Sequence, residues 1–367
     1  MATFAPVMKF PEAHRLLCAV VLLVLPRGTD VAAQAPNDRQ PRQLAEDCRI
    51  AEQILLYQRD TGGWPKNFDM ARPLSEDERA TILHDKPRTD DSTIDNGATT
   101  GEIRFLARVY QQTHDPRYLE AVRRGLYYLL SGQYAHGGWP QFWPEKKGYH
   151  AQVTFNDDAM VNTLRLLRDV HRRQPPFQGD IAGRKLRRRS AKAFDKGIEC
   201  ILNTQIVCDG QLTVWCQQHD SITLQPVGAR SFELPSYCSQ ESAAIVQLLM
   251  ELPHPNRRVK RAVTGAMLWL DEHKLTGCRV EHTGQPGTDQ QDTRLVEDPS
   301  APPLWARFYD LEQAQPFFCD RDGIPRRRLE QIGHERRNGY AWYGTRPARL
   351  YPLFQEWAKK HRVGLHL

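Results

Sequence analysis

The chain has 367 residues, enough for one large domain or two ordinary ones, and its apolar (40%) and charged (26%) fractions are those of a globular protein, not of a disordered or fibrous one. Its formal net charge of +6, from 50 Lys and Arg against 44 Asp and Glu, fits an anionic partner such as nucleic acid, a membrane surface or an acidic glycan. The basic run at 184–192 has no interleaved aromatic residues, so it is a poor nucleic-acid signature and is better interpreted as a solvated helix face.

An export signal is predicted at the N-terminus. Lys9 and Arg15 precede an apolar run over 16–25, and Val-Ala-Ala at 31–33 supplies the small residues that cleavage needs. The apolar run is too short to span a bilayer. We therefore predict a signal peptide over 1–33, a secreted protein (extracellular or periplasmic), and no membrane segment after cleavage.

The cysteines indicate disulfides and argue against zinc. Export permits disulfide formation, and no CxxC pair of the kind that binds zinc is present. Removal of Cys18 with the signal peptide leaves an odd number, so at least one thiol stays unpaired. Which cysteines pair is left open by the sequence. The seven that remain are Cys48, Cys200, Cys208, Cys216, Cys238, Cys278 and Cys319.

Helical spacing of apolar residues dominates the chain after a predicted polar linker at 34–42. Long loops rich in Gly, Pro, Asn and Asp intervene at 61–92 and 206–238, and strand-like alternation is confined to short pieces such as 211–216. We expect one mainly α-helical catalytic domain over 43–367. The predicted helical patterns cover 44–58, 98–112, 117–132, 157–172, 191–205, 241–251 and 257–273.

A short motif repeats within this helical pattern. Gly-Gly-Trp-Pro at 62–65 recurs at 137–140, and each copy follows the Tyr-containing end of a predicted helix. Gly-Gly lets the chain leave a helix through a left-handed cap, Trp packs back on the helix end, and Pro blocks continuation. The repeat predicts stacked helical hairpins around an axis, an (α/α) toroid, with a ligand groove formed by the loops at one end.

Two of the predicted helices begin with paired oxygen donors. Asp95-Asn96 precedes one helix and Asp157-Asp158 precedes another. Such residues often cap helices, but one cap oxygen is enough, so a second carboxylate is free for a ligand. Hard oxygen donors with no His or Cys beside them suit calcium, and few protein ligands would leave room for substrate carboxylates.

The same acids are also compatible with a glycoside hydrolase, because two facing carboxylates can be the acid and base of a glycosidase. A third, weaker alternative is an inactive module that binds uronates. Among basic residues, the simplest role for Arg230 is an ion pair with Glu233. His219 is a base candidate by its ordinary pKa, although a histidine in such a loop is more often structural.

Eight blocks of the sequence, in one order between about 44 and 358, resemble the pectate lyases of polysaccharide lyase family ten. Long blocks in a shared order make this resemblance specific. The blocks are 62–70 (GGWPKNFDM), 93–110 (TIDNGATTGEIRFLARVY), 137–144 (GGWPQFWP), 154–170 (TFNDDAMVNTLRLLRDV), 200–220, 229–236 (ARSFELPS), 303–310 (PLWARFYD) and 335–343 (ERRNGYAWY).

The resemblance implies an (α/α) toroid and calcium-dependent eliminative cleavage of polygalacturonate, the de-esterified backbone of pectin, to 4,5-unsaturated products. It implies that Asp95 and Asp157 contact Ca²⁺ at the cleavage site, that Arg230 is the Brønsted base, and that Arg307 and Arg321 grip uronate carboxylates. We add Asn96 and Asp158 as further candidate ligands of Ca²⁺, and we expect a monomer.

The sequence departs from the family pattern at Gly101, Phe232 and Cys238, where Thr, Tyr and a Ser-Gly turn are usual. None of these is a candidate catalytic residue. An arginine base is unusual because a free guanidinium stays protonated. We expect burial and nearby cations to lower the pKa of Arg230, which is the direction that a base requires.

Overall fold

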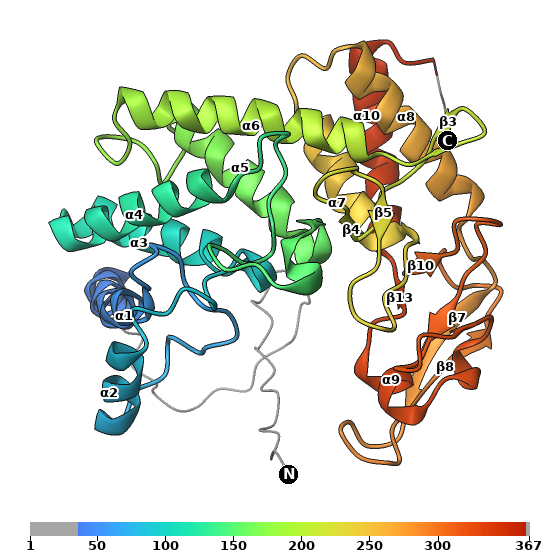
Figure 1. Ribbon diagram of the computed structural model, residues 1–367, viewed down its shortest axis with the longest axis horizontal. Coiled ribbons are helices and arrows are strands. Elements are labelled where there is room, and N and C mark those ends of the chain that lie inside the picture. The colour runs from blue at the N-terminus through green and yellow to red at the C-terminus, as the bar shows by residue number, and fades with distance from the viewer. Residues whose placement is uncertain (1–35, 365–367) are drawn as a thin grey trace, which may run out of the picture.

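The computed structural model describes residues 36–364, so the predicted signal peptide lies outside the described residues. Helices make up nearly half of this range and are its main secondary structure (Figure 1). The α-helices are α1 (Pro36–Tyr57), α2 (Glu76–His84), α3 (Thr100–Thr113), α4 (Pro116–Gly132), α5 (Ala159–Arg172), α6 (Arg184–Thr204), α7 (Ser239–Met250), α8 (Arg257–Glu272), α9 (His334–Gly339) and α10 (Leu350–His361).

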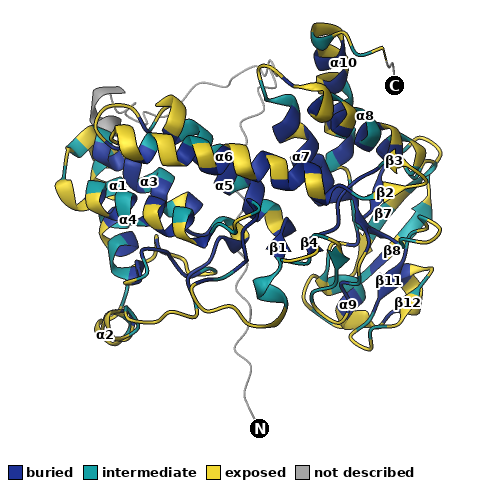
Figure 2. Ribbon diagram, turned by 45° about the horizontal axis from the view of Figure 1, so that its top comes forward, coloured by how far each residue is buried: buried dark blue, intermediate teal, exposed yellow. Residues whose placement is uncertain are grey.

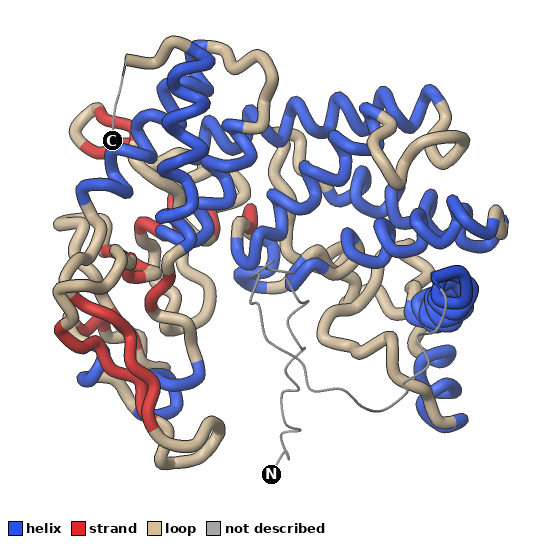
Figure 3. Tube along the Cα trace, turned by 180° about the vertical axis from the view of Figure 1, so that it is seen from behind, coloured by secondary structure: helices blue, strands red, loops and turns tan. Residues whose placement is uncertain are grey.

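The strands are short and pair antiparallel, and most of them gather in the C-terminal half (Figure 3). The longest pair is the hairpin of β7 (Cys278–Thr283) and β8 (Asp292–Glu297). The other strands are β1 (Val153–Thr154), β2 (Val207–Cys208), β3 (Gln211–Leu212), β4 (Gln218–His219), β5 (Pro226–Val227), β6 (Tyr237–Cys238), β9 (Trp305–Ala306), β10 (Phe308–Tyr309), β11 (Phe318–Cys319), β12 (Pro325–Arg326) and β13 (Tyr343–Gly344).

The helices pack as two rows. The first, which we call the inner row, runs α1, α3, α5, α7, with α10 against α7. The second, the outer row, runs α4, α6, α8. Consecutive helices α3–α4, α5–α6 and α7–α8 form hairpins that join the rows, and each helix buries an apolar stripe between its neighbours (Figure 2). This arrangement confirms the predicted mainly α-helical, toroid-like fold.

The repeated tryptophan makes the same hydrogen bond after successive helices. Each helix end, with the loop and tryptophan that follow it, is called a unit below. The indole Nε1 of Trp64 donates to the carbonyl of Ile54 at 2.8 Å, and that of Trp139 donates to Leu129 at 2.7 Å. Trp215 repeats the arrangement toward Ile201 at 2.7 Å, although no Gly-Gly precedes it. All three rings are fully buried. The structure therefore contains a third unit that the sequence motif did not reveal.

A glutamine directly after α1, α4 and α6 belongs to the same repeated arrangement. The amides of Gln58, Gln133 and Gln205 each donate to a carbonyl of the following loop and to a carbonyl of the next helix of the outer row, at 2.7 to 3.0 Å. Each glutamine thus satisfies two backbone acceptors that the turn and helix packing would otherwise leave unpaired.

The first glycine of each Gly-Gly pair has a positive φ, 94° at Gly62 and 104° at Gly137, but it lies in the loop after the helix. The predicted left-handed helix cap is therefore wrong, since α1 ends at Tyr57 and α4 ends at Gly132 with an extended cap residue, Gln133. Each glycine also packs on the next helix of the outer row. A Cβ on Gly137 would lie 2.0 Å from the carbonyl oxygen of Lys196, and one on Gly62 would lie 2.6 Å from that of Arg124. The motif is therefore fixed by close packing as well as by the turn.

Several boundaries differ from the sequence prediction. Helix α1 begins at Pro36, inside the predicted linker 34–42, whose Gln and Arg residues have good helix propensity. Helix α6 starts at Arg184, so the basic run 184–192 is part of it and is mostly solvent-exposed, as interpreted. Only Gln211–Leu212 of the predicted strand 211–216 forms a strand. No helix in the described range is long and apolar enough to cross a membrane.

Candidate functional site

The predicted acidic residues lie where helices of the inner row begin. Asp95 belongs to the short 3₁₀ segment η1 (Asp95–Gly97) before α3, and Asp157 to η3 (Asn156–Asp158) before α5. These two segments pack against each other. Glu241 adds a third acid in the first turn of α7. Because helix N-termini carry partial positive charge, their convergence favours anionic groups at this point.

The two acidic helix starts are offset by one residue. In both loops a threonine N–H donates to the carbonyl of the repeated tryptophan, at 3.1 Å. Counted from these threonines, Asp95 corresponds to Asn156, and Asn96 corresponds to Asp157. The matching backbone angles agree, since Asn96 and Asp157 have positive φ of 52° and 48°. Asp95 is therefore buried, whereas the side chain of Asp157 is 44% exposed.

Asn156 joins the two carboxylates. Its amide Nδ2 donates to Oδ2 of Asp157 at 2.8 Å and to Oδ1 of Asp95 at 3.5 Å. Lys66 forms an ion pair with Asp95. Burial raises the pKa of Asp157 to about 6; Arg307 opposes this rise, and the negative charge of Asp95 adds to it. The two carboxylates therefore lie close enough for the charge of one to act on the other.

Asn96 and Asp158 lie at the edge of this pair. Asn96 is exposed and donates to Oδ1 of Asn67 at 2.9 Å. Asp158 is ion-paired with Arg346, just before α10. Although Asp158 is the N-cap residue of α5, its side chain makes no capping hydrogen bond. The capping interpretation is therefore wrong for Asp158, and calcium binding by these two residues stays a prediction.

Arg230 is paired with Glu233, as its simplest interpretation predicted. Its Nε donates to Oε2 of Glu233 at 2.7 Å, and its guanidinium lies 4.7 Å from the centre of the Phe232 ring. Burial lowers the pKa of Arg230, but the hydrogen bonds and charge of Glu233 outweigh burial, so the pKa is raised. The expected lowering is therefore wrong for the ligand-free protein, because the sequence did not show how closely this carboxylate is held.

A hydrogen-bonded chain connects Arg230 with the carboxylate pair. The amide of Gln217 donates to Oε1 of Glu233 at 3.2 Å and also to Oδ1 of Asn156. The hydroxyl of Tyr340 donates to the same Glu233 oxygen at 2.7 Å. Asn156, Gln217 and Tyr340 were not singled out from the sequence, because amides and tyrosines far apart in the chain carry no local signal of a shared site.

Arg307 lies inside this network. Its Nη2 donates to Oδ1 of Asn156 at 3.2 Å and is 4.0 Å from Oδ1 of Asp157. It also forms an ion pair with Glu241, and its guanidinium faces the ring of Tyr340 at 4.8 Å. Burial works to lower the pKa of Arg307, yet Glu241 raises it overall. The structure therefore brings Arg307 together with the acidic pair.

Arg321 lies at the protein surface, next to Phe232. Its side chain is 64% exposed and pairs with Glu335 at 3.0 Å, while its guanidinium lies 5.9 Å from the ring of Phe232. Arg336 covers the same ring at 4.6 Å. Arg230, Arg321 and Arg336 thus surround one aromatic side chain. This arginine cluster at Phe232 supplies several cations next to the network.

His219, the other base candidate from the sequence, has a structural role. His219 is buried, its Nδ1 contacts the carbonyl of Leu224 at 3.0 Å, and its Nε2 accepts from the backbone N–H of Cys216 at 3.2 Å. Burial lowers the pKa of His219 to about 4. Its neutral ring therefore bridges two backbone groups and does not face the site.

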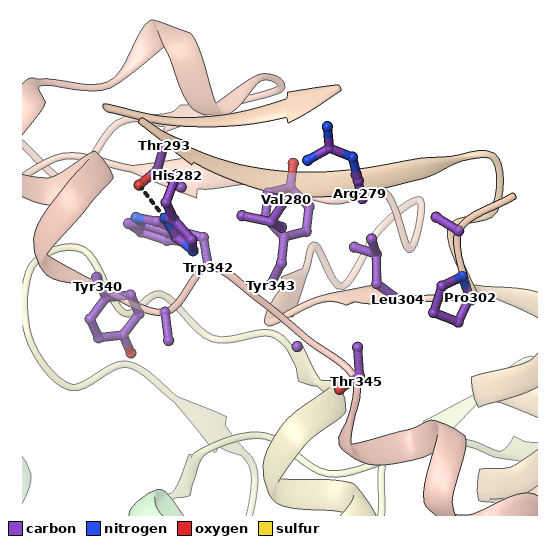
Figure 4. A pocket seen from close by; sticks show the side chains of 13 residues that line it. Arg279, Val280, His282, Thr293, Pro302, Leu304, Tyr340, Trp342, Tyr343 and Thr345 are labelled. Carbon is purple, nitrogen blue, oxygen red and sulfur yellow. Dashed lines mark hydrogen bonds between the residues drawn. The ribbon is translucent and has the colours of Figure 1, made fainter. Parts of the chain in front are cut away.

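A cavity of about 370 Å³ lies beside the network, between the β7–β8 hairpin and residues 340–345 (Figure 4). Tyr340 forms one wall, and apolar side chains including Val280, Leu304 and Trp342 line much of the rest. No carboxylate lines it, so the acidic chemistry lies on the other side of Tyr340 and not in this hollow.

Comparison with known proteins agrees with this arrangement. The pectic acid lyase family matches residues 58–351, most of the chain. The search of curated protein sequences found no match to this chain.

Two solved structures of a family 10 polysaccharide lyase from Cellvibrio cellulosa are similar. A mutant in complex with trigalacturonic acid is 33% identical with a TM-score of 0.75, covering 88% of this chain and 97% of the other. The second is 32% identical with a TM-score of 0.74, covering 87% and 95%. The chain therefore belongs to the pectic acid lyase family, and its activity is that of a lyase on pectic acid, the de-esterified polygalacturonate.

Proposed function

We propose that this lyase cleaves polygalacturonate by calcium-assisted β-elimination, with Arg230 as the base. The observation that carries the proposal is the hydrogen-bonded chain from the Asp95–Asp157 pair through Asn156 and Gln217 to Glu233, which holds Arg230. This chain fixes an anionic, metal-binding end and a basic end in one rigid site, as elimination next to a carboxylate requires.

The Asp95–Asp157 pair fits a calcium ion. The two carboxylates are joined by the amide of Asn156, and burial, with a smaller contribution from the charge of Asp95, raises the pKa of Asp157. Within residues 36–364 no cluster of three or more His, Cys, Asp or Glu side chains could hold a metal alone. Asp95 and Asp157 would therefore hold Ca²⁺ together with oxygens from substrate or water. When bound, the ion supplies a Lewis acid that stabilises negative charge on the uronate carboxylate.

Arg307 and Arg321 are proposed to bind uronate carboxylates. Arg307 is held in place by Glu241 and Asn156 beside the acidic pair, so its orientation is set before substrate arrives. Arg321 is exposed at the surface, so its guanidinium is accessible to a polymer chain. Planar guanidinium groups bind carboxylates through two parallel hydrogen bonds. The trigalacturonic acid in the similar Cellvibrio structure supports an acidic galacturonate chain as the ligand.

β-Elimination removes the C5 proton, next to the C6 carboxylate, and expels the glycosidic oxygen from C4 of the same sugar. Arg230 is proposed to accept that proton on its guanidine group. Because Glu233 raises the pKa of Arg230, the neutral guanidine is scarce near neutral pH in the free protein. We therefore expect turnover to rise toward alkaline pH.

We further propose that the enzyme is exported through the signal peptide over 1–33 and acts as a monomer on the acidic polysaccharide of plant cell walls. The apolar run with its preceding basic residues supports export. Export also fits the substrate, because the polysaccharide of plant cell walls lies outside the cell that makes the enzyme.

The test is an assay of polygalacturonate that follows both ultraviolet absorbance and reducing ends. We expect absorbance from the unsaturated product, its loss with chelator and its recovery with Ca²⁺. Arg230→Ala is expected to lower kcat by at least a hundredfold. Arg258→Ala is the matched control, because this exposed arginine on α8 pairs with Glu199 outside the site. Reducing ends without absorbance would identify a hydrolase, and an active Arg230→Ala would exclude Arg230 as base.

A further inference from the structure

The third unit carries a cysteine where the first two carry proline. Pro65 and Pro140 directly follow their tryptophans, whereas Cys216 follows Trp215. Trp215 otherwise repeats the hydrogen bond of Trp64 and Trp139. The substitution therefore falls at an equivalent position of the repeated structure.

A second cysteine replaces a threonine in the same unit. The backbone N–H groups of Thr93 and Thr154 donate to the carbonyls of Trp64 and Trp139, and that of Cys238 donates to the carbonyl of Trp215 at 2.8 Å. The two positions that approach each other across this bridge are therefore both cysteines in the third unit, and in neither of the first two.

The side chains of Cys216 and Cys238 lie between the same two backbone segments. Sγ of Cys238 accepts from the N–H of Gln217 at 3.1 Å, and Sγ of Cys216 accepts from the N–H of Ser236 at 3.5 Å. Each sulfur thus sits against the backbone next to the other cysteine, and each thiol shifts the pKa of the other. Both residues are at most 1% exposed.

The other described cysteines have different neighbours. Cys200 contacts Nδ1 of His136 at 3.7 Å, Cys208 contacts Asp209, and Cys319 contacts backbone carbonyls. In the part of the chain that the structure describes, no hydrogen bond places the sulfur of these three, or of Cys48 or Cys278, against the backbone beside another cysteine. The pairing that the sequence left open is therefore narrowed to one pair by geometry.

We propose that Cys216 and Cys238 form a disulfide bond in the exported protein. The two thiols lose two protons and two electrons as the S–S bond forms, and an oxidant of the disulfide class, such as oxidised glutathione, is reduced to two thiols. The proposal depends on export into an oxidising compartment and not on the reaction that the enzyme catalyses.

The bond would close the loop 217–237 beside the site. This loop contains Gln217, Arg230 and Glu233, three members of the hydrogen-bonded chain. Because both sulfurs are buried, the bond must form before the third unit closes, and a reductant should reach it only after unfolding. A disulfide restricts the unfolded chain and so stabilises the folded loop.

Peptide mapping of the full chain, exported to a bacterial periplasm and purified without reductant, tests the proposal. The protein is denatured with iodoacetamide present, digested and analysed by mass spectrometry before and after reduction. We expect one linked species joining the peptides of Cys216 and Cys238, which separates on reduction. Alkylation of both cysteines without prior reduction, or linkage of either one to another cysteine, would overturn the proposal.

Thermal unfolding supplies a second measurement. Protein that is reduced in denaturant and refolded without oxidant is expected to melt several degrees below the oxidised protein, and native protein should resist the same reductant. Cys238→Ser should melt at one temperature under both treatments. Cys278→Ser, in strand β7, should keep the full difference. A wild-type melting temperature that is the same after both treatments would count against the bond.

Discussion

At the scale of single residues, the sequence identified the chemical groups but not their contacts. The oxygen-rich helix starts predicted Asp95 and Asp157 as a pair, and the structure brings them together through Asn156. The two loops are offset by one residue, which buries Asp95 and exposes Asp157. This offset was not predicted, because the hydrogen bonds that align each loop with its tryptophan are visible only in the folded chain. The same limit concealed the strength with which Glu233 holds Arg230.

Glu233→Gln tests the base directly. Loss of the carboxylate charge removes the main group that raises the pKa of Arg230, so neutral guanidine becomes more abundant at a given pH. We expect the alkaline rise of kcat/KM to move to lower pH, measured as a full pH profile on polygalacturonate. Glu199→Gln, which removes an exposed acid paired with Arg258, should leave the profile in place. A Glu233→Gln profile with an unmoved midpoint would argue against Arg230 as the titrating base.

The two acids of η3 are expected to differ in their effect on calcium. Asp157→Asn should raise the calcium concentration for half-maximal activity by at least tenfold, because it removes one of the two proposed carboxylate ligands. Asp158→Asn should raise it less, since its carboxylate is engaged by Arg346. Calcium titrations of both variants make the comparison, and equal requirements would contradict the assignment of Asp157.

At the scale of elements, the Gly-Gly-Trp-Pro repeat was enough to predict stacked hairpins. What it missed was the third unit, whose identity rests on Gln205 and Trp215 alone. Those side chains repeat the hydrogen bonds of the first two units without repeating the glycines, so a motif search has nothing to match. The β7–β8 hairpin was also missed, because its half-exposed strands lack a clean apolar alternation.

Gly137→Ala should destabilise the fold by more than about 2 kcal/mol, because it combines a left-handed backbone with a Cβ 2.0 Å from the carbonyl oxygen of Lys196. Gly148→Ala is the matched control: its φ is also positive, at 54°, but no atom lies within 4 Å of the added Cβ. We expect it to cost only about 1 kcal/mol. Urea unfolding of both variants measures the difference, and equal losses would refute the packing argument.

Glu102, in the first turn of α3, should make stability depend on pH. Burial raises the pKa of Glu102 from 4.5 to about 7, and its Oε2 is buried without a hydrogen-bond partner. A raised carboxyl pKa favours the folded state at low pH, and this contribution is lost as pH rises from about 4.5 through 7. Glu102→Gln should therefore be more stable than wild type at pH 8, by about 1 to 3 kcal/mol, and similar at pH 4.

Thermal or urea unfolding at these two pH values checks the Glu102 prediction. If Glu102→Gln is as stable as wild type at pH 8, the carboxylate is better solvated than its position indicates.

At the scale of the whole molecule, the site is a product of topology. Three inner helices, α3, α5 and α7, begin at the same end of the array, so acids far apart in sequence meet where helix N-termini converge. The C-terminal segment adds Arg307 and Tyr340, which hydrogen-bond to Asn156 and Glu233. Family resemblance predicted that Arg307 belongs to the site, but only the folded chain shows that Tyr340 connects it to Glu233.

The central claim is that this array breaks the polymer by elimination. In the most direct measurement, the enzyme digests polygalacturonate in water labelled with oxygen-18, and the masses of the products are determined by mass spectrometry. Elimination adds no water across the cleaved bond, so we predict products that contain no heavy oxygen and in which one of each new pair of ends is unsaturated. One heavy oxygen incorporated for each bond cleaved, with no unsaturated end, would contradict the account and identify a hydrolase.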